Sequence, residues 1–187
     1  MAKHDPIKGQ YIYLTVDGTE YRVYYEEAGE GIPLLVGHTA GSDGRQYRHL
    51  LCDSDVTNNF RTIAFDLPFH GKSLPPYGKK WWAEEYNMTK KLMMEFPNTL
   101  SKELNLDQPV YMGQSMGGHL AIDLASNYPE DYRATIAVEG ALRSAAEYVE
   151  VGMSGIRFEF DNPNVNRAST GAAMMLNLSP YSPEESI

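Results

Sequence analysis

A serine flanked by glycines is the feature of this sequence with the clearest chemical meaning. Residues 113–117 read Gly-Gln-Ser-Met-Gly, so Ser115 has a glycine two positions before it and another two positions after it. Small residues at these places allow a sharp, strained turn from which the serine hydroxyl stands free. A helix that begins at this turn directs its first N–H groups toward negative charge developing beside the hydroxyl. The pattern predicts that Ser115 is a nucleophile in acyl transfer.

The same five residues have two other interpretations. They fit a glycine-containing strand-to-helix turn in which the serine is incidental, and such a turn can also bind a phosphate. The flanking segments favour the nucleophile, because 109–112 is a short apolar strand and 116–127 predicts a strong helix. In that helix Gly118 and Ala121 allow close packing against a sheet.

The rest of the chain predicts the sheet that must hold this turn. β-Branched and aromatic residues fill 11–16 and 21–25 on either side of Asp17-Gly18, a pair typical of an antiparallel hairpin. Further strands are expected at 32–36, 61–65, 109–112 and 134–138, and helices at 46–52, 82–104 and 116–127. Ser42 or Asp43 is the expected cap of the first helix, and Pro97 is expected to kink or divide the second. Alternating strands and helices predict an α/β fold with a mostly parallel sheet and helices on both faces.

Composition limits the kinds of partner. The 187 residues are 42% hydrophobic and 22% charged, which is typical of a soluble globular protein with one core. The net charge of -9 disfavours binding to nucleic acid or to an anionic membrane surface. Cys52 is the only cysteine, so a disulfide within the chain and a thiolate metal cluster are both excluded. With no apolar run long enough to span a membrane and no signal-like start, we expect a cytoplasmic protein without metal or cofactor.

Three motifs, in the order expected, resemble the α/β-hydrolase family over about residues 11–140. Residues 36–41, Val-Gly-His-Thr-Ala-Gly, resemble its His-Gly oxyanion loop, with Thr39 where glycine is usual. Residues 66–73, Asp-Leu-Pro-Phe-His-Gly-Lys-Ser, are similar to its Asp-x-x-Gly-His-Gly-x-Ser turn, with Phe69 where glycine is usual. Residues 113–117 match its nucleophile elbow. The resemblance implies an α/β-hydrolase fold.

The resemblance also implies roles for the residues around the serine. The backbone N–H groups of Ala40 and Met116 would form the oxyanion hole, and Thr39 is a further candidate donor. His38 and Gln114 are candidate substrate contacts. For His38, as for His70 in the second motif, a structural role that braces the loop is the favoured interpretation.

The groups that would move the serine proton are incomplete. In the family the nucleophile is followed in the chain by an acid and then by a histidine. Glu139, at the end of the strand expected at 134–138, is either that acid or a rim carboxylate that contacts substrate or solvent. No histidine follows His119, so the base histidine is expected to be absent from this chain.

The last part of the sequence reads as an unfinished unit. We expect 1–140 to be the N-terminal core of the α/β-hydrolase domain and 141–187 the start of a lid, with Met174, Met175 and Leu176 supplying apolar surface. The chain is accordingly expected to be a fragment, inactive by itself, in which the C-terminal part of the fold is incomplete.

The function predicted is that of a serine hydrolase acting on a small-molecule substrate, a carboxylic ester or a related lactone, thioester or carbon–carbon bond beside a ketone. A serine nucleophile argues against the carboxylate-based chemistry of haloalkane dehalogenases and epoxide hydrolases. The alternative is a non-catalytic α/β-hydrolase-like binding protein or an inactive fragment. The sequence makes no prediction of the oligomeric state.

Overall fold

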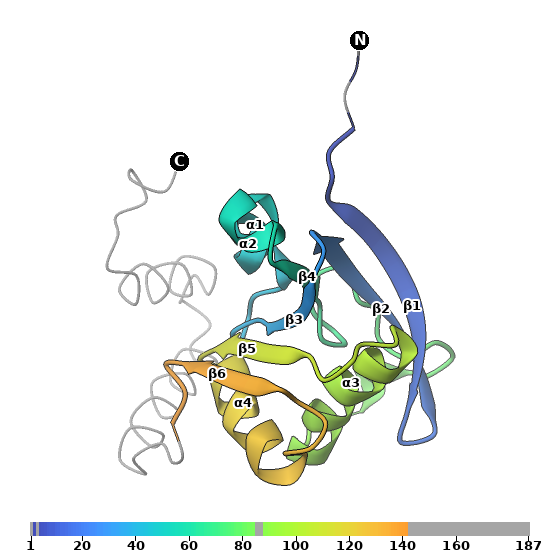
Figure 1. Ribbon diagram of the computed structural model, residues 1–187. Coiled ribbons are helices and arrows are strands. Elements are labelled where there is room, and N and C mark those ends of the chain that lie inside the picture. Colours follow the sequence, from blue (N-terminus) through green and yellow to red (C-terminus); the bar gives the residue numbers. More distant parts are fainter. Residues whose placement is uncertain (1, 3, 85–87, 142–187) are drawn as a thin grey trace, which may run out of the picture. The chain divides into compact units, whose positions relative to one another are not determined.

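The described residues form a single six-stranded sheet (Figure 1). The computed structural model describes residues 2, 4–84 and 88–141, so the expected lid at 141–187 lies almost entirely outside the described residues. The strands are β1 (Lys8–Val16), β2 (Thr19–Ala28), β3 (Ile32–Gly37), β4 (Phe60–Phe65), β5 (Val110–Gln114) and β6 (Ala134–Val138). Their order across the sheet is β1-β2-β4-β3-β5-β6.

The strand pairings confirm the α/β arrangement. β1 and β2 form the antiparallel hairpin expected around Asp17-Gly18, and β2 also pairs antiparallel with β4. From β4 onward the neighbouring strands are parallel, which brings the carboxyl ends of β3, β4, β5 and β6 to one edge. The loop after β3, the turn after β4 and the serine turn after β5 therefore lie at the same edge of the sheet.

The helices follow the expectation in part. They are the 3-10 turn η1 (Gly44–Tyr47), α1 (Arg48–Cys52), α2 (Ser54–Thr57), the 3-10 turn η2 (Trp81–Ala83), α3 (Lys90–Glu103) and α4 (Met116–Asn127). α4 has both of its expected bounds. The helix expected at 46–52 is divided between η1 and α1, and Asp43 caps it by accepting a hydrogen bond from the N–H of Arg45.

The prediction of a helix at 82–104 is wrong at its N-terminal end, because α3 begins at Lys90. Glu84 has an extended backbone, which ends η2, and α3 begins only after Thr89, whose hydroxyl accepts from the N–H of Leu92. This N-cap supplies a partner for one of the free N–H groups of the first helical turn. α3 then runs as one helix through the buried Pro97, so the expected division into two helices does not occur.

Two apolar clusters sandwich the sheet, because successive side chains of a strand point to opposite faces. Leu35, Ile63, Phe65 and Tyr111 pack with buried residues of α3 and α4 on one face. The residues between them, Leu34, Val36, Ala64 and Val110, pack with Tyr47 and Leu51 from η1 and α1 on the other. Figure 1 shows α3 and α4 together, away from α1 and α2. Burial on both faces is the reason that β3 reads as a nearly continuous apolar run.

Leu100 tests how far α3 stabilises the sheet. Its side chain is fully buried in the first cluster. Leu100→Ala should lower the free energy of unfolding by about 2–5 kcal/mol, since it leaves a cavity in a packed core. Urea denaturation measures the change, with Leu74→Ala as a control at a side chain that is 49% exposed. Equal effects of the two substitutions would contradict this packing.

Candidate functional site

Ser115 occupies a strained turn between β5 and α4. It is the single residue between the two elements, and its φ of 52° and ψ of -110° are rare for any residue with a side chain. Its N–H donates to the carbonyl oxygen of Val138 at 2.9 Å, which ties the turn to the end of β6. The backbone at Ser115 thus has the sharp, strained conformation that the sequence pattern predicted.

Three glycines make this turn possible. A Cβ at Gly113 would lie 2.2 Å from the carbonyl oxygen of Gly117, and a Cβ at Gly117 would lie 2.2 Å from that of Gly37. A Cβ at Gly118 would lie 2.5 Å from the carbonyl oxygen of Val138. Since each obstacle is backbone rather than a movable side chain, larger residues require the turn itself to shift.

The candidate oxyanion donors differ in whether their N–H groups already have a hydrogen-bond acceptor. The first bond within α4 runs from the N–H of His119 to the carbonyl of Ser115 at 2.8 Å, so the Met116 N–H has no acceptor within the helix. The Thr39 N–H donates to Gln46 Oε1 at 2.9 Å and is therefore occupied. Ala40, which is exposed, and Met116 remain the candidate donors.

His38 is fully buried and holds two loops together. Its Nε2 accepts from the N–H of Leu67 at 3.1 Å, so the neutral ring carries its proton on Nδ1, which donates to the Thr39 carbonyl at 2.8 Å. The ring of His70 lies 4.9 Å away, and His70 Nδ1 bonds the carbonyl of Pro68 at 3.0 Å. These contacts favour the bracing interpretation of both histidines over contact with a substrate.

Burial shifts the protonation of His38. Desolvation lowers the pKa of His38 below its ordinary 6.5, and the nearby His70 lowers it further. The Thr39 carbonyl, Asp66 and Asp43 oppose the shift without cancelling it. The neutral form, which the bond from Leu67 requires, is thus the favoured one in the folded protein.

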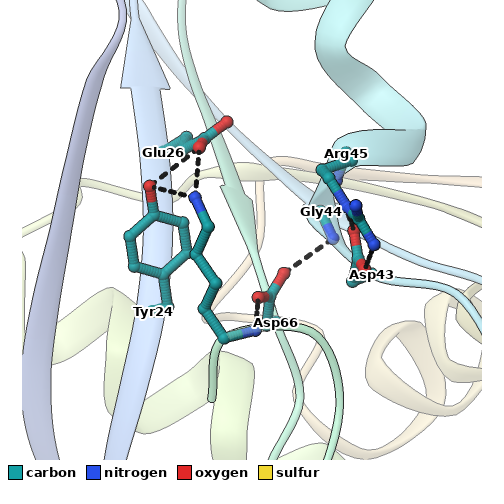
Figure 2. A network of polar contacts seen from close by, with 7 residues as sticks. Tyr24, Glu26, Asp43, Gly44, Arg45 and Asp66 are labelled. Carbon is teal, nitrogen blue, oxygen red and sulfur yellow. Dashed lines mark hydrogen bonds and ion pairs between the residues drawn. The ribbon is translucent and has the colours of Figure 1, made fainter.

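Asp66 links the loop after β3 to the turn after β4 (Figure 2). One carboxylate oxygen accepts from the N–H of Gly44 and the other from the N–H of Lys72, both at 2.7 Å. Ser73 Oγ donates to the Asp66 carbonyl at 2.7 Å. At Gly71, where φ is 51°, a Cβ would lie 2.3 Å from the carboxylate, so glycine is needed there. The second motif therefore supports the loop after β3 through the bond between Asp66 and Gly44.

Phe69 shows how the second motif tolerates a departure from the family pattern. It stands where glycine is usual, and its φ of 67° lies in the left-handed region that glycine adopts easily. Phe69 therefore adopts a backbone conformation that side chains other than glycine rarely take.

Glu139 and Gln114 belong to a continuous series of hydrogen-bonded side chains. Glu139 follows β6, and its Oε2 accepts from Gln114 Nε2 at 2.8 Å. Gln114 Oε1 accepts in turn from Gln46 Nε2 at 2.6 Å. Sequence reasoning missed Gln46, because nothing in the residue pattern relates it to a glutamine 68 positions later.

The histidines of the chain do not complete a proton-transfer pair. Within the described residues, the Ser115 hydroxyl forms no hydrogen bond to any of His4, His38, His49, His70 and His119. His119 lines a cavity of about 230 Å³, together with Lys90, Met93, Met116, Leu120 and Asp123.

Metal-binding clusters and membrane-spanning helices are both absent from the described residues. No three His, Cys, Asp or Glu side chains there gather as ligands for a metal ion. No helix in that part of the chain has the length and apolar character to cross a membrane.

Comparison with known proteins identifies the family. Residues 32–181 match the alpha/beta hydrolase fold family, and the chain belongs to it. A curated relative, the 2-hydroxy-6-oxononadienedioate/2-hydroxy-6-oxononatrienedioate hydrolase of Burkholderia vietnamiensis, is 28% identical over 153 residues, which cover 79% of this chain and 50% of the relative. The chain thus spans about half the length of the curated relatives it matches.

Solved structures agree on the fold. An esterase from Thermogutta terrifontis superposes with a TM-score of 0.66 at 23% identity, over 83% of this chain and 55% of the esterase. The N-acyl homoserine lactonase AidH superposes with a TM-score of 0.54 at 27% identity, over 68% of this chain and 44% of the lactonase.

Gly117 provides a direct test of the serine turn. Gly117→Ala should lower the free energy of unfolding by about 1–3 kcal/mol, since the added methyl meets the Gly37 carbonyl. Ser126→Ala, on an exposed position of the same helix, should change it by no more than about 0.5 kcal/mol. Thermal unfolding of both variants measures the difference. A Gly117→Ala variant as stable as the control would refute the close contact.

His38 should make stability depend on pH. Its folded pKa is lowered, so below pH 6.5 the unfolded state binds the proton first. The free energy of unfolding should therefore fall as the pH drops from about 6.5 toward the folded pKa, and be retained above 6.5. Urea titrations at several pH values measure this slope. It should shrink in His38→Gln and persist in the exposed-site control His49→Gln; the same slope in both variants would contradict the assignment to His38.

Proposed function

We propose that this protein is a serine hydrolase that cleaves a small carbonyl substrate by acyl transfer. Ser115 is the nucleophile, and the N–H groups of Ala40 and Met116 stabilise the oxyanion. The observation that carries the proposal is the strained backbone of Ser115, held by three glycines against neighbouring backbone. A strained turn of this kind costs about 1–3 kcal/mol, a cost that a purely binding protein has no reason to retain.

The reaction proceeds in two halves. Ser115 Oγ attacks the carbonyl carbon and gives up its proton to a base, and the carbonyl oxygen becomes the oxyanion. Collapse of this intermediate expels the leaving group, which takes the proton, and leaves an acyl group on Ser115. Water then attacks the acyl carbon by the same route and releases the acid.

The base and the acid complete the proposal. A serine hydroxyl is too weakly acidic to ionise unaided near neutral pH. We assign the base to a histidine outside this sequence, supported by the absence of a Ser115–histidine bond within the described residues and by the greater length of the relatives. Glu139, exposed at the carboxyl end of β6, is the candidate acid that orients this histidine.

We assign the class of bond that this hydrolase cleaves. A carboxylic ester is the first candidate, and a lactone or thioester would use the same oxyanion. Cleavage of a carbon–carbon bond beside a ketone is the second candidate. It is favoured by the curated relatives named as 2-hydroxy-6-oxononadienedioate/2-hydroxy-6-oxononatrienedioate hydrolases.

Ser115→Ala in the whole protein tests the nucleophile. We expect loss of covalent labelling by a fluorophosphonate probe and a fall in p-nitrophenyl acetate hydrolysis of about 10⁴-fold or more, because no other group forms the acyl-enzyme. Ser126→Ala should retain both activities. Absence of labelling in the wild-type protein would overturn the proposal. Strong labelling of the 187-residue chain alone would overturn the assignment of the base to an outside residue.

A further inference from the structure

Four polar groups from separate parts of the chain form one continuous line of hydrogen bonds. The Thr39 N–H donates to Gln46 Oε1 at 2.9 Å, and Gln46 Nε2 donates to Gln114 Oε1 at 2.6 Å. Gln114 Nε2 then donates to Glu139 Oε2 at 2.8 Å. We call these three side chains, Gln46, Gln114 and Glu139, the amide relay. It connects the oxyanion loop, η1, the end of β5 and the end of β6.

The two ends of the relay fix its direction. The backbone N–H of Thr39 can only donate, so Gln46 must present its oxygen to it and its NH₂ group to Gln114. Gln114 must then present its oxygen to Gln46 and its NH₂ group to Glu139. The carboxylate at the far end can only accept, which agrees with this order. All the dipoles point the same way, an arrangement in which each bond strengthens the next.

The relay holds one side of Thr39, and His38 holds the other. The Thr39 N–H is bound by Gln46, and the Thr39 carbonyl accepts from His38 Nδ1 at 2.8 Å. That carbonyl shares a peptide plane with the N–H of Ala40, and in a trans peptide the two groups point in opposite directions. Fixing both peptides of Thr39 therefore fixes where the Ala40 N–H points.

We propose that Gln46 is a positioning residue of the oxyanion loop, with Gln114 as its link and Glu139 as its anchor. The amide relay holds the Thr39 N–H away from the reaction centre and leaves Ala40 as the donor from this loop. Gln114 acts through the relay, because its oxygen and its nitrogen are both engaged there. The proposal rests on the proposed function for its consequence in catalysis, and on geometry alone for the contacts.

Reversal of the relay provides the decisive experiment. Gln46→Glu leaves an acceptor for Thr39 but removes the donor to Gln114, whose amide then lies between two carboxylates. Adding Glu139→Gln restores complementarity: Gln114 turns over, donates to the new carboxylate at position 46 and accepts from the new amide at position 139. No purely space-filling role for these side chains predicts that the second substitution repairs the first.

Amide hydrogen exchange of Thr39, followed by NMR on the whole protein, reads out the relay without requiring catalysis. Gln46→Ala should speed exchange at Thr39 roughly three- to tenfold, the factor expected for loss of one hydrogen bond. Gln46→Glu should also speed it, and the Gln46→Glu/Glu139→Gln pair should return it to within about twofold of wild type. Gln108→Ala, which removes a glutamine bonded to the Glu130 carbonyl, is the matched control and should leave Thr39 unchanged.

Two results would overturn the proposal: unchanged Thr39 exchange in Gln46→Ala, or a double variant that exchanges as fast as Gln46→Glu. In catalysis, Gln46→Ala should lower kcat for p-nitrophenyl acetate about tenfold with a smaller change in KM, since an oxyanion donor acts in the transition state. Equal changes in both constants would count against a positioning role. A wild-type protein that neither labels nor hydrolyses would refute the proposed function, while the exchange measurements would still decide whether the relay exists.

Discussion

The approach of α4 to β3 at Gly117 and Gly37 is the contact on which the site depends. Here the first turn of a helix meets the backbone at the end of a strand, and no side chain separates them. This contact sets Ser115 at the carboxyl edge of the sheet and brings the loop that starts at His38 beside it. A Cβ at Gly117 would push the two apart, and with them Ser115 and the candidate oxyanion donors. The strain at Ser115 is tolerated because packing on both faces of the sheet holds the turn's surroundings in place.

The loops at this edge are held by polar groups of two kinds. The Asp66 side chain is buried, and its two oxygens accept from the backbone N–H groups of Gly44 and Lys72. His38 is buried and neutral, and it needs to remain neutral to accept from Leu67. Burial is tolerated in each case because the polar atoms have partners, and the same partners fix the backbone of the loops. The amide relay, which ends on the exposed Glu139, is a further support and binds the Thr39 N–H in the loop after β3.

Glu139 has two proposed tasks that are compatible. As the anchor of the relay it uses Oε2, and as the candidate acid it would use its other oxygen toward a histidine. Glu139 directly follows Val138, whose carbonyl oxygen accepts from the N–H of Ser115, so Glu139 and Ser115 lie at the same edge of the sheet. A single carboxylate would then support both the oxyanion loop and the base. Thr39 exchange and catalytic rate separate the two tasks.

The sequence by itself determined the serine turn, the hairpin, the mostly parallel sheet and the bounds of α4. These features depend on local signals: glycine where backbone meets backbone, Asp-Gly between strands, and apolar runs buried on both faces. It did not determine the start of α3, where a threonine cap and an extended Glu84 outweighed helix-prone residues. Tertiary structure alone decided that Thr39 gives its N–H to Gln46 and that Gln114 joins Gln46 to Glu139. Glutamine side chains carry no periodicity and bond wherever folding brings a partner, so only the assembled sheet edge reveals which ones meet.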